Sequence, residues 1–236
     1  DHIPSILVPV KSIYMVRPID LQTAGKRIGY IVGAGDKVPE ALEQMGYEVT
    51  LLGDKELSRS NLRQFDAILT GIRAHNTAPW LNSHYDKLMQ YVHGGGNLIV
   101  QYNTSNQIGP VVAKMGPFPF SITRTRVTDE AAPVTFVNPQ HPALNYPNKI
   151  TESDFKDWGQ ERSIYHAGSF DKPFETLFRM GDDGETPSEG SIITAPYGKG
   201  YFTYTGLVFF RQLPAGVPGA YRLLANLIAL NQKKTF

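Results

Sequence analysis

Three apolar runs of this chain are each followed at once by side chains that can bind a ligand or move a proton. Arginine can form paired hydrogen bonds with a carboxylate or phosphate, and histidine can exchange protons near neutral pH. Asparagine, glutamine and tyrosine add hydrogen bonds that orient a polar ligand. The candidates are Gly35, Asp36, Arg73, His75, Asn76, Gln101, Tyr102 and Asn103.

The runs themselves predict buried strands, and amphipathic helices separate them. The strand sequences are KRIGYIV, YEVTLLG, DAILTGI and NLIVQY. A helix is expected after Asp36, because Val38, Ala41, Leu42 and Met45 share one face and Asp36 can cap its start. The segment 78–93 predicts the clearest helix, with an apolar stripe of Leu81, Tyr85, Leu88, Met89 and Val92.

Strands that alternate with helices over short connections predict an α/β fold with a mostly parallel sheet and helices on both faces. The second half is extended and proline-rich, with a hairpin around Tyr197–Gly200 and a closing helix at 219–230. We expect it to add antiparallel strands to the same sheet. Residues 1–25 are interpreted as a linker or edge strand, with a short β-like run at 12–16, and 26–236 as one domain.

The carboxyl ends of neighbouring parallel strands meet at one edge of a sheet, where α/β proteins bind their ligands. The candidates therefore predict a strand-end pocket, in which Arg73 holds an acidic or hydroxyl-rich group and Tyr102 stacks on a sugar face. Glu161 and Arg211 are predicted as outer members, because Arg211 precedes a loop stiffened by proline and glycine.

The motif GAGDKV, which contains Gly35 and Asp36, has three interpretations. Its glycines can simply make a tight turn between strand and helix. The helix start can bind an anion. A dinucleotide site is the third, with Asp54 as the ribose-binding acid, although the last glycine of that fingerprint is missing.

The sequence gives little support for covalent catalysis or for a metal site. The chain has 0 cysteines, and the strand end around Tyr102 lacks the small neighbours that a nucleophile elbow needs. The 6 histidines show no metal-binding spacing. We therefore predict no catalytic residue, no metal and no cofactor. A net charge of +1 argues against nucleic-acid partners, and no apolar run is long enough to span a bilayer.

Several segments together resemble a known fold family. The sequences KRIGYIVGAGDKVPEALEQMGYEVTLL, FDAILTGIRAHNT and YVHGGGNLIVQYNT resemble the class I glutamine amidotransferase-like fold, in its ThuA-like branch. The segments RVTDEAAPV, NKITESDFKDWGQER and TGLVFFRQLPAGVPGAYRL are similar to a domain that follows LmbE/PIG-L-type deacetylase domains in some bacterial proteins.

The resemblance implies a flavodoxin-like or amidotransferase-like fold and a preceding deacetylase domain as partner in one polypeptide. It does not imply glutamine hydrolysis, because Tyr102 or Asn103 stands near the place of the nucleophilic cysteine. We expect a non-catalytic module that binds a sugar or small polar ligand for a bacterial sugar deacetylase. The alternatives are a hydrolase with His75 as general base and a purely structural, oligomer-forming module. We expect a bacterial protein, and the sequence does not distinguish a periplasmic or secreted location from a cytoplasmic one.

Overall fold

A computed structural model describes residues 18–105 and 111–232. Its central feature is a sheet of 7 strands in the order β2-β1-β3-β4-β12-β11-β9. The first four strands in the chain are β1 (Arg27–Ile31), β2 (Glu48–Leu51), β3 (Ala67–Thr70) and β4 (Asn97–Gln101). Those from the second half are β9 (Glu175–Thr176), β11 (Ile192–Tyr197) and β12 (Gly200–Thr205).

The register confirms the predicted mixture of parallel and antiparallel pairing. β1 pairs in parallel with β2 and β3, β3 with β4, and β4 with β12. β11 runs antiparallel to both β12 and β9. The predicted hairpin is therefore present, with β12 inserted beside β4, so that both halves of the chain build one sheet. The fold is the flavodoxin-like or amidotransferase-like α/β fold that the sequence predicts.

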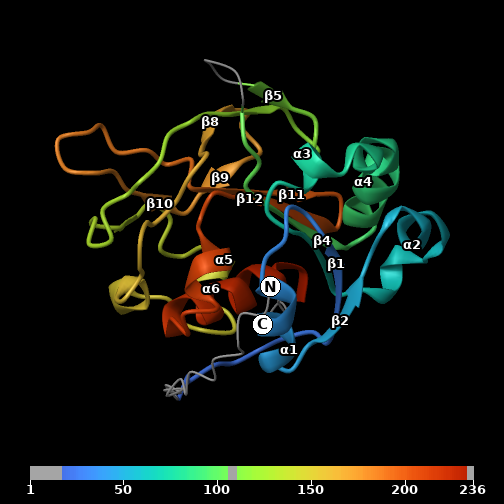
Figure 1. Cartoon of the computed structure of the whole chain (residues 1–236), viewed down its shortest axis with the longest axis horizontal. Coiled ribbons are helices and arrows are strands. Elements are labelled where there is room, and N and C mark those ends of the chain that lie inside the picture. The colour runs from blue at the N-terminus through green and yellow to red at the C-terminus, as the bar shows by residue number, and fades with distance from the viewer. Residues whose placement is uncertain (1–17, 106–110, 233–236) are drawn as a thin grey trace, which may run out of the picture.

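Helices cover both faces of this sheet. Because successive side chains of a strand point to opposite faces, each strand contributes residues to two separate cores. Ile28 and Leu69 join α1 (Val38–Gln44) and α6 (Pro218–Ile228) in one core. Ile31 and Ile68 join α2 (Asp54–Arg59) and α4 (Tyr85–His93) in the other. Figure 1 shows α1 and α6 grouped on one side of the sheet and α2 and α4 on the other.

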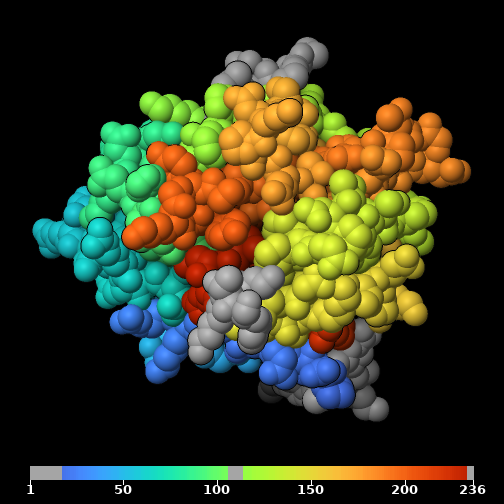
Figure 2. All heavy atoms as spheres, turned by 180° about the vertical axis from the view of Figure 1, so that it is seen from behind, coloured from blue at the N-terminus to red at the C-terminus, as the bar shows by residue number. Residues whose placement is uncertain are grey.

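Segments of the second half pack around the main sheet. Two smaller sheets have the orders β5-β6-β8 and β10-β7. In Figure 2 the yellow-green to orange segments form much of the face seen from behind, and the red C-terminal part shows only in small areas. The remaining elements are η1 (Leu62–Gln64), α3 (Ala74–Thr77), η2 (Pro79–His84), β5 (Val111–Ala113), β6 (Phe120–Ile122), β7 (Thr135–Phe136), η3 (Pro142–Leu144), η4 (Glu152–Phe155), β8 (Ala167–Phe170), β10 (Phe178–Arg179), α5 (Phe209–Gln212) and η5 (Leu230–Gln232).

Two local expectations need correction or remain open. The helix expected over 78–93 is divided into the 3-10 helix η2 and α4, and Pro79 begins the 3-10 part because proline tolerates only the start of a helix. Residues 18–25 form no strand. They pack along the body of the protein, where Gln22 donates its N–H to the Asn148 side chain at 2.9 Å. The β-like run at 12–16 lies outside the described residues.

Candidate ligand site at the strand ends

The carboxyl ends of β1, β3 and β4 lie side by side and are tied together by backbone hydrogen bonds. The Ala34 N–H donates to the Ile72 carbonyl at 2.8 Å, and the Arg73 N–H donates to the Tyr102 carbonyl at 2.8 Å. The structure thus brings the loops that carry most of the predicted site residues to one edge of the sheet.

Asp36 holds this edge together. Its Oδ1 accepts from the Tyr30 hydroxyl at 2.6 Å and from the N–H of Val38, the first residue of α1, at 3.0 Å. The cap position itself is Lys37, so Asp36 lies one residue before the predicted cap. Its Oδ2 accepts from the Ile72 N–H at 3.0 Å. Both carboxylate oxygens are therefore engaged inside the protein, and the structure gives Asp36 a structural role in place of the predicted ligand contact.

The neighbouring Gly35 also has a structural explanation. Its φ of +98° lies in the region that favours glycine, and a Cβ there would have no atom within 4 Å. Asp54, the acid of the dinucleotide interpretation, pairs with His84 at 2.6 Å between its Oδ1 and Nε2. The GAGDKV motif is thus explained by a tight turn, and the dinucleotide interpretation loses its ribose-binding acid.

Gln101 extends the same network below the surface. It is 2% exposed, and its Nε2 donates to the Tyr30 hydroxyl at 3.1 Å and to the Thr70 carbonyl at 3.2 Å. Burial first, and then the nearby Asp36 carboxylate, raises the pKa of Tyr30 well above its ordinary value, so its hydroxyl stays protonated and donates. Gln101 therefore supports the site from beneath.

Asparagine side chains fix the loop after β3 against the loop after β4. Asn103 accepts the His75 N–H at 2.9 Å through its Oδ1, and Asn76 exchanges two hydrogen bonds with the backbone of Thr104, at 2.8 and 3.1 Å. His75 is half-buried, and burial lowers its pKa to about 4, opposed by a hydrogen bond with Asn82. The imidazole is therefore neutral at pH 7 and a weak base.

Tyr102 belongs to an aromatic cluster and presents no open face. Its ring stacks on Tyr165, with centroids 5.7 Å apart and planes 7° apart, and lies 5.6 Å from the Phe210 ring. Tyr102 is only 7% exposed, whereas Tyr165 and Phe210 are half-buried. The predicted stacking of Tyr102 on a sugar is contradicted, because Tyr165 already covers its ring.

Two arginines flank the cluster formed by Tyr102, Tyr165 and Phe210. Arg73 and Arg211 are the charges that lower the pKa of Tyr102, against the larger effect of burial that raises it. Arg211 pairs with Glu161 at 2.8 Å, and its guanidinium lies 4.9 Å from the Phe210 ring centroid. Arg73 is exposed, and within the described residues its guanidinium has no hydrogen-bond or carboxylate partner. It is free to bind an anion.

Backbone strain concentrates at the same place. Among the described residues, the non-glycine residues with positive φ are Arg73 (58°), Asp157 (61°), Gln160 (69°) and Tyr165 (51°). Arg73 and Tyr165 contact or flank Tyr102, and Gln160 accepts a hydrogen bond from Arg211. Such conformations cost of order 1–3 kcal/mol each and gather at binding and catalytic sites. This is a physical reason to regard the edge as functional.

The sequence analysis did not single out Phe210, Gln160 or Tyr165 as site residues. Phe210 immediately precedes Arg211, so a search for aromatic residues beside the candidate arginines would have found it. Nothing in the sequence indicates the positive φ of Tyr165, or that its carbonyl accepts from the Tyr204 hydroxyl at 2.6 Å.

One further pair has the chemistry of a nucleophile and base, but the fold encloses it. Ser163 Oγ lies 2.7 Å from His166 Nε2, and both residues are 0% exposed. The other ring nitrogen of His166 lies 3.0 Å from Ser188 Oγ, and burial lowers its pKa to about 4. No substrate can reach this pair, so we assign it to the core.

The part of the chain that the structure describes contains neither a cluster of metal-binding side chains nor a helix that could span a membrane. Within residues 18–105 and 111–232, no group of three or more histidine, cysteine, aspartate or glutamate side chains is arranged to hold a metal ion. No helix in these ranges is long and apolar enough to cross a bilayer.

Comparison with known proteins identifies the fold of this chain but no family to which it belongs. Neither a protein-family model nor a curated protein sequence matches this chain. The cytoplasmic protein STM1381 from Salmonella typhimurium LT2 is similar in structure, with 10% identity and a TM-score of 0.52, over 88% of this chain and 100% of that one. A β-galactosidase from the haloarchaeon Halorubrum lacusprofundi has 12% identity and a TM-score of 0.51.

The aligned fractions show that this chain corresponds to only part of each β-galactosidase. This chain aligns over 92% of its own length but spans only 32% of the Halorubrum β-galactosidase, and 31% of a β-galactosidase from Rahnella. A protein described as ThuA-like, from Bacteroides uniformis, aligns over 92% of this chain and 95% of its own at a TM-score of 0.42 and 13% identity. At these identities the likenesses to STM1381 and to the two β-galactosidases show the fold alone.

Proposed function

We propose that this chain is a non-catalytic, amidotransferase-like module that binds an acidic or hydroxyl-rich ligand at the strand ends. The observation that carries the proposal is the exposed, unpaired guanidinium of Arg73 beside the aromatic cluster, on a backbone held at a φ of 58°. The positive φ costs of order 1–3 kcal/mol and such conformations gather at binding sites. The exposed guanidinium, with no protein partner among the described residues, is available for paired hydrogen bonds to an anionic ligand.

The residues at the strand ends favour a non-catalytic module over an enzyme. Tyr102 occupies the strand end where the related fold carries its nucleophile, and its ring is buried. The general base of the hydrolase alternative, His75, has a pKa lowered to about 4, which weakens it as a proton acceptor at pH 7. Neither group is suited to drive hydrolysis.

We propose further that the module serves a bacterial sugar deacetylase, as the sequence resemblance suggests. The fold occurs as about a third of larger enzyme chains, here β-galactosidases, which supports a role as part of a multidomain protein. The ligand is then a sugar acid or an anionic group of the carbohydrate substrate. The alternative of a purely structural module predicts no ligand at all.

A thermal-shift screen tests the binding proposal. We expect a sugar acid such as glucuronate or gluconate, or inorganic phosphate, to raise the Tm of the wild-type chain. At about 100 times its Kd, such a ligand adds about 2.7 kcal/mol to the free energy of unfolding. Arg73→Ala should abolish the shift, because the replacement removes the charge without breaking any side-chain hydrogen bond or ion pair within the described residues.

Arg63→Ala is the matched control. Arg63 is an exposed arginine on η1, just before β3 and therefore at the opposite end of the sheet, so its loss should leave the shift unchanged. Absence of a shift with every compound, in a folded protein, would favour the structural module.

A further inference from the structure

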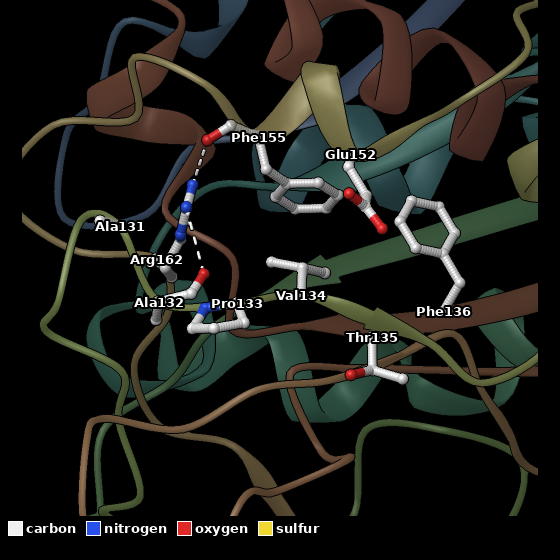
Figure 3. A pocket seen from close by; sticks show the side chains of 9 residues that line it. All are labelled: Ala131, Ala132, Pro133, Val134, Thr135, Phe136, Glu152, Phe155 and Arg162. Atoms are coloured by element: carbon white, nitrogen blue, oxygen red, sulfur yellow. Dashed lines mark hydrogen bonds between the residues drawn. The ribbon is translucent and has the colours of Figure 1, made fainter.

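A cavity of about 400 Å³ lies apart from the aromatic cluster, in the second half of the chain. Its walls come from the segment 131–136, which includes β7, and from Glu152, Phe155 and Arg162 (Figure 3). The volume is that of pockets that hold small organic ligands. No residue of the proposed strand-end site lines it.

The notable group in this cavity is a buried guanidinium. Arg162 is 5% exposed, its Nη1 donates to the Phe155 carbonyl, and its Nη2 donates to the Ala132 carbonyl at 3.2 Å. Its Nε has no hydrogen-bond partner among the described residues. Figure 3 shows the two carbonyl bonds at opposite ends of the guanidinium.

The positive charge of Arg162 lacks a direct counter-charge. No carboxylate in the described residues forms an ion pair with it, although Asp129 and Glu130 act on it from farther away. Burying a charge that is held only by neutral carbonyls is costly, and an arginine in such a place is normally paired. A carboxylate that enters the cavity would supply the missing partner.

The remaining walls define the rest of the ligand. The Phe155 ring centroid lies 5.8 Å from the Arg162 Cζ atom, and Val134 and Phe136 face the same space (Figure 3). These side chains are apolar and suit an aliphatic or aromatic body. Glu152 lies on the far side of the Phe155 ring and is exposed, so water screens its charge from a ligand carboxylate at Arg162.

We propose that this cavity binds a small organic acid with an apolar body, whose carboxylate pairs with Arg162. The ligand class follows from one buried cation at one end and the apolar side chains of Phe155, Val134 and Phe136 beside it. The site is independent of the proposed strand-end function, because neither its charge nor its walls belong to that edge.

Isothermal titration of the full chain with 3-phenylpropionate, hexanoate and benzoate tests this site. At least one acid should bind the wild type, and the neutral 3-phenylpropionamide should bind at least about tenfold more weakly than 3-phenylpropionate. Arg162→Met should weaken acid binding by about tenfold or more. Arg179→Met, which changes an exposed arginine paired with Glu189, should leave binding unchanged.

A second variant keeps the test decisive if Arg162→Met does not fold. Val134→Phe adds volume to the half-buried wall of the cavity while leaving the charge in place, and it should abolish binding of the acids. The proposal is overturned if none of the three acids binds the wild type, if the amide binds as well as the acid, or if a folded Val134→Phe protein binds normally.

Discussion

Gly33→Ala is expected to destabilise the protein by about 3 kcal/mol or more and to open the strand-end edge. A Cβ at this position would lie 2.0 Å from the Ile72 carbonyl oxygen and 2.9 Å from the Gly71 carbonyl carbon. Both contacts are with backbone, so no side chain can rotate away. The change would separate the loops after β1 and β3, where the Ala34 N–H now donates to Ile72.

Urea unfolding of Gly33→Ala and wild type measures this cost directly. Gly159→Ala is the matched control, because a Cβ at Gly159 meets no atom within 4 Å and its φ is not in the positive region. Its free energy of unfolding should stay within about 0.5 kcal/mol of wild type. Equal stability of Gly33→Ala and Gly159→Ala would show that β1 and β3 do not approach each other as described.

Acidification is expected to cost the protein about 2.5 kcal/mol of stability through His166 alone, between pH 7 and about pH 4.5. The folded pKa of His166 is lowered by burial from 6.5 to about 4. The unfolded chain therefore binds a proton first as pH falls. The stability is complete above about pH 6.5 and is lost as pH falls from there toward 4.

Unfolding by urea at several pH values, for wild type and His166→Gln, isolates this contribution. The variant removes the titrating group, so between pH 7 and about pH 4.5 its stability should fall by about 2.5 kcal/mol less than that of wild type. His93→Gln, at an exposed position on α4, should behave as wild type does. Parallel pH profiles for His166→Gln and wild type would contradict the assignment.

Much of the fold could be predicted from the sequence because each element carries its own periodicity. The apolar runs of β1, β3 and β4 and the helical stripe of Leu88, Met89 and Val92 depend on burial alone. The order of the strands in the sheet could not be predicted in the same way. β12 (Gly200–Thr205) lies beside β4 (Asn97–Gln101), which is far away in the sequence, and no local pattern indicates this pairing.

The sequence predicted where the candidate residues lie better than it predicted the contacts that they make. The loops after β1, β3 and β4 do meet, because parallel strands align their ends. The role of each side chain depends instead on which groups it contacts in the folded protein. Asp36 finds three donors and Tyr102 finds the Tyr165 ring, whereas Arg73 finds no partner among the described residues. Of these partners, Ile72 and Tyr165 come from distant segments and are fixed only by the fold.

The most direct test of the strand-end site is an NMR titration of the backbone amides with the compound that gives the largest thermal shift. We predict that the perturbed amides belong to the loop 71–76, to 102–104, and to Tyr165 and Arg211, and that Arg73→Ala removes the perturbation. Perturbations confined to other parts of the protein, or unchanged in Arg73→Ala, would contradict the proposal that this edge of the sheet binds the ligand.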